Sequence, residues 1–290
     1  MRIKTLPIFL VFFVMGFGDV VGTLVGFVTK EFSLSSSLAG LLPFAGLIQF
    51  GLFSVPVGIL SDRKGKKYVL ITFLLIALFG LLIPSISIAR YHYVLIAIFM
   101  VGTGMCGLQV AGNPAMRDVS KEGRYSRNLT FAQFIKSIGT NTGPYVVPLI
   151  IFLGLAWKNI FLIYAFVVAI TLITVLPVKM GKSGEAKGLN SLASLGSSFA
   201  LLKNRRVSLM VLGIFLYVGA EVGLNSWIAT YLQNRFGLNI ESLATLGIGF
   251  FLTSLVIGRL LGTIILSYLY PRKFFIISSL VGMLGLVGMF

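Results

Sequence analysis

The segment Gly58-Ile59-Leu60-Ser61-Asp62-Arg63-Lys64-Gly65-Lys66-Lys67 lies between two long apolar runs of the chain. A connection this short can join two membrane spans only as a tight hairpin. Its four cations within five residues predict a turn on the cytoplasmic side, because short loops rich in Lys and Arg stay inside. Gly58 and Gly65 are expected to let the backbone turn and approach its neighbours closely. Asp62 is expected to accept from helix-terminal N–H groups or to pair with an arginine. We therefore assign a structural or gating loop to Gly58, Asp62, Arg63, Gly65 and Lys66.

The composition excludes a soluble protein. Of the 290 residues, 57% are hydrophobic and 11% are charged, which is typical of a chain that lies in a bilayer. A formal net charge of +16 would suggest nucleic-acid binding in a soluble domain, but here the cations gather in loops between apolar runs. Attraction to anionic lipid and control of topology explain this pattern, so the expected partner is membrane lipid and not nucleic acid.

Apolar runs of about 20 residues, the length that crosses the hydrocarbon core as a helix, recur along the chain. Nine candidate spans follow from them: residues 6–29, 38–60, 68–89, 92–115, 128–153, 157–178, 207–232, 242–267 and 273–290. The turns after the even-numbered spans carry most of the Lys and Arg, which predicts a cytoplasmic amino terminus. The expected fold is all-α, a multi-pass protein of a bacterial inner membrane.

The long polar break at residues 179–206 is expected to separate a six-helix bundle, residues 1–178, from a partial bundle, residues 207–290. Its second half predicts a short helix on the cytoplasmic surface, because apolar residues recur there at helical spacing: Leu189, Leu192, Leu195, Phe199 and Leu202. The chain stops at Phe290 inside an apolar run, so we expect a fragment of a twelve-span protein.

The two bundles share an internal repeat. Leu60-Ser61 and Lys66-Lys67-Tyr68 align with Leu266-Ser267 and Arg272-Lys273-Phe274, at an offset of 206 residues (266 − 60). Asp19 in span one aligns with Glu221 in span seven at an offset of 202 (221 − 19). Parallel repeats of this kind build the two halves of some secondary transporters.

Charged residues at membrane depth are the candidates for function. An ionised carboxylate there costs about 2.5 kcal/mol or more, so Asp19 and Glu221 are expected to be protonated, paired or exposed to water. Both are assigned to proton coupling, and the alternative is a hydrogen-bonded structural acid at a helix contact. Lys136 in span five either pairs with Asp19 or extends its stem toward the interface. Arg259 in span eight either lines the inner half of the cavity or braces the span-eight hairpin, and we favour bracing.

Uncharged polar side chains at the same depth complete the candidate cavity. Amides donate and accept at once, which suits the hydroxyl groups of a sugar, and an indole can stack on a pyranose face. Each of them could instead join two helices. With Lys136, the candidate substrate-binding residues are Gln49, Gln109, Asn113, Gln133, Asn141, Asn225 and Trp227.

The residue inventory argues against an enzyme. His92 is the one histidine and Cys106 the one cysteine, so a catalytic His triad and a zinc-ligand cluster are excluded. A phosphate-binding loop of the G-x-x-x-x-G-K-[ST] type is absent from the sequence. We expect no cofactor and no metal.

The pattern G-x-L-x-D-R-x-G-x-K at residues 58–67 resembles the loop between spans two and three of the major facilitator superfamily. Within that superfamily the chain is similar to the fucose–galactose–glucose proton-symporter family. The likeness rests on Gly18-Asp19-Val20, Phe50-Gly-Leu-Phe-Ser-Val-Pro56, Leu108-Gln109-Val-Ala-Gly-Asn113-Pro114, Asn128-Leu-Thr-Phe-Ala-Gln133 with Gly139, and Tyr217-Val-Gly-Ala-Glu-Val-Gly223 with Asn225-Ser-Trp227.

The resemblance implies proton-linked sugar binding by Asp19 and by a glutamate in span four. This chain has Gln109 where that glutamate is expected, and Lys136 where a fucose permease has an asparagine. Glutamine does not titrate, so proton coupling would fall to Asp19 or be absent.

The predicted function is secondary active transport of a sugar by alternating access, with a hexose or deoxyhexose such as fucose, glucose or galactose taken up together with a proton. One alternative is a proton-driven exporter of drugs or other small molecules, because Gly139-x-x-x-Gly143-Pro144 resembles the antiporter signature of span five. A second alternative is a sensor or a truncated homologue that transports nothing.

Overall fold

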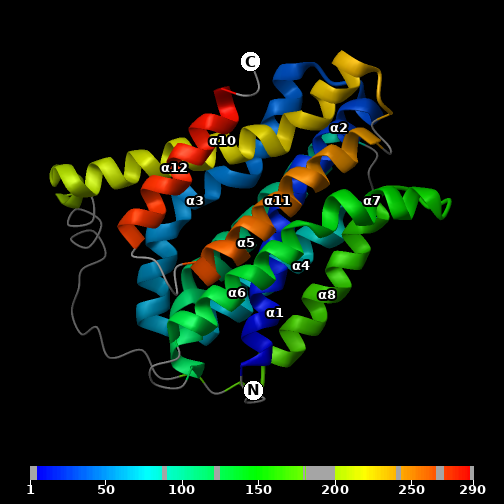
Figure 1. Cartoon of the computed structure of the whole chain (residues 1–290). Coiled ribbons are helices and arrows are strands. Elements are labelled where there is room, and N and C mark those ends of the chain that lie inside the picture. The colour runs from blue at the N-terminus through cyan, green and yellow to red at the C-terminus, as the bar shows by residue number, and fades with distance from the viewer. Residues whose placement is uncertain are drawn as a thin grey trace.

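The structure is a computed structural model that describes residues 5–86, 90–120, 125–178, 180, 200–239, 243–265 and 271–287. Every regular element in these ranges is helical (Figure 1). In chain order they are α1 (Leu6–Met15), η1 (Gly16–Val20), α2 (Val21–Phe32), α3 (Ser36–Lys64), α4 (Lys66–Ile86), α5 (Tyr91–Val119), α6 (Tyr125–Thr140), α7 (Thr142–Phe152), α8 (Asn159–Val175), η2 (Leu201–Lys203), α10 (Arg205–Phe236), α11 (Leu243–Ile265) and α12 (Pro271–Val287). The predicted all-α, polytopic fold is confirmed.

Each of the nine predicted spans coincides with helical chain. Six helical stretches among the described residues are long and apolar enough to cross a membrane: Leu6–Phe32, Ser36–Lys64, Lys66–Pro84, Tyr91–Val119, Arg205–Phe236 and Thr245–Gly262. Two shorter apolar helices, Asn159–Val175 and Lys273–Gly285, cover the sixth and ninth spans. The fifth span consists of two helices, α6 and α7, because Pro144 has no N–H to donate to the carbonyl of Thr140.

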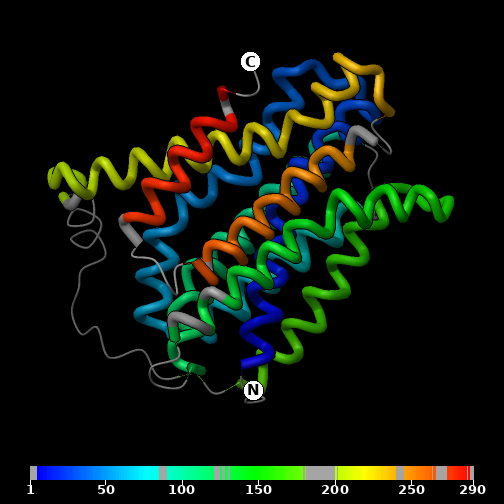
Figure 2. The backbone as a smooth tube through the Cα atoms, in the orientation of Figure 1, coloured from blue at the N-terminus to red at the C-terminus, as the bar shows by residue number. Residues whose placement is uncertain are grey.

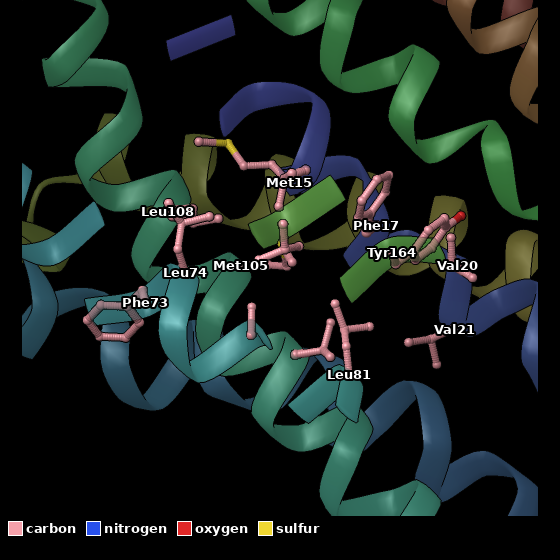
Figure 3. Packing of buried hydrophobic residues seen from close by; sticks show 14 of the residues in the cluster. Met15, Phe17, Val20, Val21, Phe73, Leu74, Leu81, Met105, Leu108 and Tyr164 are labelled. Atoms are coloured by element: carbon pink, nitrogen blue, oxygen red, sulfur yellow. The ribbon is translucent and has the colours of Figure 1, made fainter. Parts of the chain in front are cut away.

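Span one is the central helix of the larger helical group. Figures 1 and 2 show α1 and α2, in blue, running through the interior between the other helices. Most side chains of α1 are buried, including Ile8, Val11, Phe12 and Val14. One face, with Leu6, Leu10 and Phe13, is less buried. The same core continues through α4, α5 and α8, and Figure 3 shows part of it. The side chains of residues 20–28, in the second half of span one, are therefore inside the protein.

The Gly65 hairpin is as tight as the sequence predicts. One residue, Gly65, separates α3 from α4, and its φ of +91° favours glycine. Lys66 donates to both carboxylate oxygens of Asp118 at 2.8 Å and so joins the start of α4 to the end of α5. We call the side of the bundle that carries this turn the basic end.

Two expectations for the hairpin are wrong. Gly58 lies within α3, and a Cβ there would meet only Val110 at 4.0 Å, an ordinary contact. Asp62 is exposed at the end of α3, and it is Asp118 that supplies the carboxylate for the turn. Arg63 is also exposed.

A smaller apolar cluster joins α10 to α11 through Ala229, Ile248 and Leu252. The second half of α10 packs against α2, while its first half, from Arg205, is exposed (Figure 1). The predicted surface helix falls largely on residues 181–199, outside the described ranges. The division into domains at 1–178, 179–206 and 207–290 stays a prediction.

Candidate functional site

Span one changes helical geometry at its polar residue. Residues Gly16–Val20 form a 3-10 segment between α1 and α2, and such a segment inside a long helix often marks a functional hinge. The segment crosses α6 at very short range: a Cβ on Gly16 would overlap the backbone of Lys136 and Thr140, and one on Gly139 would overlap the carbonyl oxygen of Phe13. Glycines at this crossing let span one and α6 approach closely enough for Asp19 to accept from the hydroxyl of Thr140.

Asp19 lies between two groups of helices: the larger group, α1 to α8, and the smaller group, α10 with α11. Its Oδ2 accepts a hydrogen bond from Thr140 Oγ1 of α6 at 2.7 Å, and its backbone oxygen accepts one from Asn225 Nδ2 of α10 at 3.0 Å. A cavity of about 20 Å³ beside it is lined in part by Asp19, Gly22 and Asn225, and a cavity of this size holds one water molecule. Asp19 as a residue is partly exposed.

Lys136 does not pair with Asp19. Its Nζ donates to Gln109 Oε1 of α5 at 2.9 Å, and no ion pair joins it to an acid among the described residues. One turn away, Gln133 Nε2 makes a long hydrogen bond of 3.5 Å to Asn113 Oδ1. These two contacts are stacked, because 133 and 136 share a face of α6 and 109 and 113 share a face of α5. We call these four residues the amide–lysine cluster; all four are partly exposed.

Glu221, which aligns with Asp19 in the internal repeat, is held by an arginine and not by a hydroxyl group. Arg259 NH2 donates to Glu221 Oε1 at 3.1 Å, and Arg259 NH1 donates to Ser137 Oγ at 2.6 Å. These contacts tie α10 and α11 to α6. The residue of span seven that contacts Asp19 is Asn225. It lies 206 residues after Asp19, the same offset that relates the two basic turns of the internal repeat.

The remaining candidates are spread over the molecule. Asn141 Nδ2 donates to Thr253 Oγ1 of α11 at 2.9 Å, and Tyr145 binds the same hydroxyl. Gln49 is 0% exposed between α3 and α5, and its Nε2 donates to the carbonyl oxygens of Ala45 and Phe99. Gln49 is therefore away from the amide–lysine cluster. Trp227 is 37% exposed on α10.

Trp227 lines a larger cleft between α3 and α10, with a volume of about 750 Å³. Its lining is almost entirely apolar and includes Phe50 and Phe215. It shares Pro43, Leu47, Val222 and Ser226 with the small cavity beside Asp19, so the cleft ends next to that carboxylate. The helices α2 and α10 meet in the second half of α10, where Gly22 contacts Asn225. The α10–α11 pair thus meets the larger group of helices beside Asp19 and where α11 contacts α6 and α7, and the cleft lies between α3 and the first half of α10.

The family follows from a comparison with known proteins. A model described as "Major Facilitator Superfamily" matches residues 8–290. The chain belongs to the major facilitator superfamily. It is accordingly a multi-pass membrane transporter of that type, as the Gly65 hairpin and the parallel repeat suggest.

Relatives within the superfamily carry sugar-transporter names. A "Putative glucose/galactose transporter" of Helicobacter pylori is 25% identical over 285 residues, covering 93% of this chain and 69% of the relative. A "Glucose/galactose transporter" of Brucella abortus is 26% identical over 279 residues, covering 91% of this chain and 67% of the relative. An "L-fucose-proton symporter" of Escherichia coli is 25% identical over 290 residues, covering 88% and 65%.

Solved structures share the fold at lower identity. A D-xylose-proton symporter has a TM-score of 0.68 and 17% identity, covering 91% of this chain and 68% of its own. A single-residue variant of the fucose:proton symporter of E. coli has a TM-score of 0.65 and 22% identity, covering 94% of this chain and 74% of its own.

Sequence reasoning missed three hydroxyl groups that organise the site of this transporter: Thr140, Ser137 and Thr253. Thr140 lies one helical turn after Lys136, so the spacing was available as a signal. Ser137 and Thr253 had no such signal, because a hydroxyl in an apolar helix commonly bonds to its own backbone. Asp118 was also missed, although a single acid beside Arg117 in a basic region is a signal for an ion pair.

Proposed function

We propose that this superfamily member is a secondary active sugar transporter that takes up a monosaccharide together with a proton by alternating access. The observation that carries the proposal is the environment of Asp19. Asp19, at membrane depth, is partly exposed and lies beside a water-sized cavity; its carboxylate accepts from the hydroxyl of Thr140 and forms no ion pair with a residue that the structure describes. A proton bound to Asp19 would offset the cost of holding a charge at this depth.

The neighbouring amides support a hydroxyl-rich substrate. The amide–lysine cluster places Gln109, Asn113 and Gln133 on facing sides of α5 and α6. Asn141 and Asn225 each have a buried Oδ1 without a partner among the described residues, and Asn225 lines the cavity beside Asp19. Such acceptors suit the O–H groups of a sugar. The sugar names of the relatives agree with this choice.

The arrangement of helices supports alternating access. The two helical groups touch through α2 and α10 beside Asp19 and through α11 against α6 and α7, and the cleft between α3 and α10 opens beyond the α2–α10 contact. We place the basic end in the cytoplasm of a bacterial inner membrane, with the amino terminus on the same side, following the distribution of Lys and Arg. The cleft then belongs to an inward-facing state, and rocking the groups about the α2–α10 contact would expose Asp19 to the other side.

The test compares two modes of transport in proteoliposomes. Asp19→Asn removes the titratable group, so accumulation driven by a proton gradient is lost while counterflow of labelled sugar, which needs no gradient, is kept. Glu31→Gln is the matched control, since Glu31 is an exposed acid at the end of α2. Gradient-driven accumulation that survives Asp19→Asn unchanged refutes the proton-coupling role.

A proton-driven exporter of apolar molecules is the second candidate, favoured by the apolar lining of the cleft between α3 and α10. A panel of labelled sugars and of apolar cations, tested by counterflow on the same vesicles, separates the two functions. Exchange of the apolar compounds alone would support the exporter.

A further inference from the structure

We propose that the substrate is an anionic monosaccharide, such as a hexuronic or hexonic acid, and that Lys136 is the residue that recognises its carboxylate. This inference rests on the proposed function and names the substrate class of that site. Its starting point is a positive charge at membrane depth for which the described part of the chain supplies no negative partner.

The acids of the described residues are all accounted for elsewhere. Asp118 pairs with Lys66, and Glu221 pairs with Arg259. Asp62 and Glu31 are exposed at helix ends. The last acid, Asp19, accepts from Thr140. An ammonium inside a membrane protein normally pairs with an acid. Because no described acid pairs with Lys136, an anionic ligand can serve as its counter-ion.

Snorkelling does not explain Lys136. At 1.5 Å per residue, it lies about 16 Å along α6 from Tyr125, and its partner Gln109 lies about 15 Å along α5 from Val119. The hydrogen bond of 2.9 Å between them therefore holds the ammonium at depth and not at the interface. Lys136 as a residue is nevertheless partly exposed, which leaves room for a ligand in the proposed site.

The hydrogen bond to Gln109 positions the ammonium for an anion without neutralising it. An ammonium has three N–H donors, and the amide oxygen of Gln109 accepts from one of them. A carboxylate of the substrate can take the others in charge-assisted hydrogen bonds, which are about twice as strong as neutral ones. The same substrate's hydroxyl groups meet the amides Asn113 and Gln133, one turn away on the same two helices.

The position of Asp19 fits this arrangement. Lys136 and Thr140 are four residues apart on α6 and so share a face, and Thr140 carries the hydrogen bond to Asp19. The cation and the titratable acid thus lie about one turn apart without forming an ion pair. Lys136 remains available to an anion, and Asp19 remains available to a proton.

The experiment is counterflow and thermal-shift binding with the full chain in proteoliposomes and in detergent. The probes are glucuronate, galacturonate and gluconate, the neutral sugars glucose, galactose and fucose, and glucose 6-phosphate. The variants are Lys136→Met, Lys136→Arg and Gln109→Glu, with Lys158→Met, an exposed cation before α8, as the control. We expect the wild type to prefer the carboxylate sugars.

Lys136→Met is expected to weaken binding of the carboxylate sugars by roughly tenfold to a hundredfold, the loss of one hydrogen bond to a charged group. Lys136→Arg and Lys158→Met keep the affinity within a few fold. Gln109→Glu retains the lysine but supplies it with an internal anion, so it weakens acidic sugars and spares neutral ones. This variant tests the charge without removing Lys136, should Lys136→Met fail to fold.

Exchange of neutral sugars only, unaffected by Lys136→Met, would overturn this inference and leave the sugar-transport proposal standing. Displacement by glucose 6-phosphate alone would overturn the choice of a carboxylate. Absence of counterflow with any sugar, neutral or acidic, would overturn both proposals.

Discussion

Replacing Gly139 by alanine tests whether the crossing of span one and α6 builds the site. An added Cβ would overlap the carbonyl oxygen of Phe13, and it would also lie 3.0 Å from that carbonyl carbon and 3.4 Å from Gly16 Cα. All three atoms are backbone, so no side-chain rotation relieves the overlap and the two helices must move apart. Alanine by itself favours a helix over glycine by roughly 0.5–1 kcal/mol.

Overpacking of this kind costs about 1–3 kcal/mol, so the net loss of stability in Gly139→Ala is about 0.5–2 kcal/mol. At about 2–4 °C per kcal/mol, the apparent Tm of the purified protein should fall by roughly 1–8 °C. Displacement of Thr140 from Asp19 should also reduce proton-driven uptake. Thermal unfolding in detergent and uptake into vesicles measure the two effects.

The matched control is Gly219→Ala in α10, where a Cβ would meet nothing within 4 Å. Its Tm should stay the same or rise slightly, because only the helix propensity changes. If Gly139→Ala melts with the control and transports normally, the close crossing does not hold the site together.

Two further substitutions test particular parts of the structure. Gly65→Ala forces a residue with a Cβ to a φ of +91° and should lower the free energy of unfolding by about 1–3 kcal/mol. Gly58→Ala in α3 is the control and should be neutral. Thermal unfolding of the two variants measures the difference, and equal melting temperatures would contradict the turn geometry. Gln49→Met removes a fully buried amide whose Oε1 has no partner among the described residues. Stability should therefore change by less than about 1 kcal/mol, and sugar counterflow should be unaffected. A loss of sugar affinity in this variant would return Gln49 to the binding site.

The helices and the Gly65 turn could be predicted because the bilayer imposes them. Apolar runs of about 20 residues have to be helical there, and a polar break has to be a turn. The division of span five into α6 and α7 was not predicted: Pro144 lacks an N–H, but Pro43 and Pro56 lie inside α3 without dividing it. The 3-10 geometry of Gly16–Val20 was visible only as an excess of glycine in span one.

The depth of each polar residue could be predicted, but its partner could not. Counting residues along a helix placed Asp19 and Lys136 inside the membrane, yet left open whether they touch, and they do not pair. The alignment of Asp19 with Glu221 gave a plausible symmetry, and the structure instead brings Asn225 to Asp19 and Arg259 to Glu221.

The sequence alone determined that this protein spans a membrane as a bundle of helices, because the free energy of burying each run depends only on the residues in that run. The tertiary structure alone decided which polar groups meet, since that depends on how far each helix is rotated about its axis and where it crosses the next. Those rotations are set by contacts such as Gly16 against Gly139, between residues more than a hundred positions apart. A hydropathy pattern carries no information about such pairs.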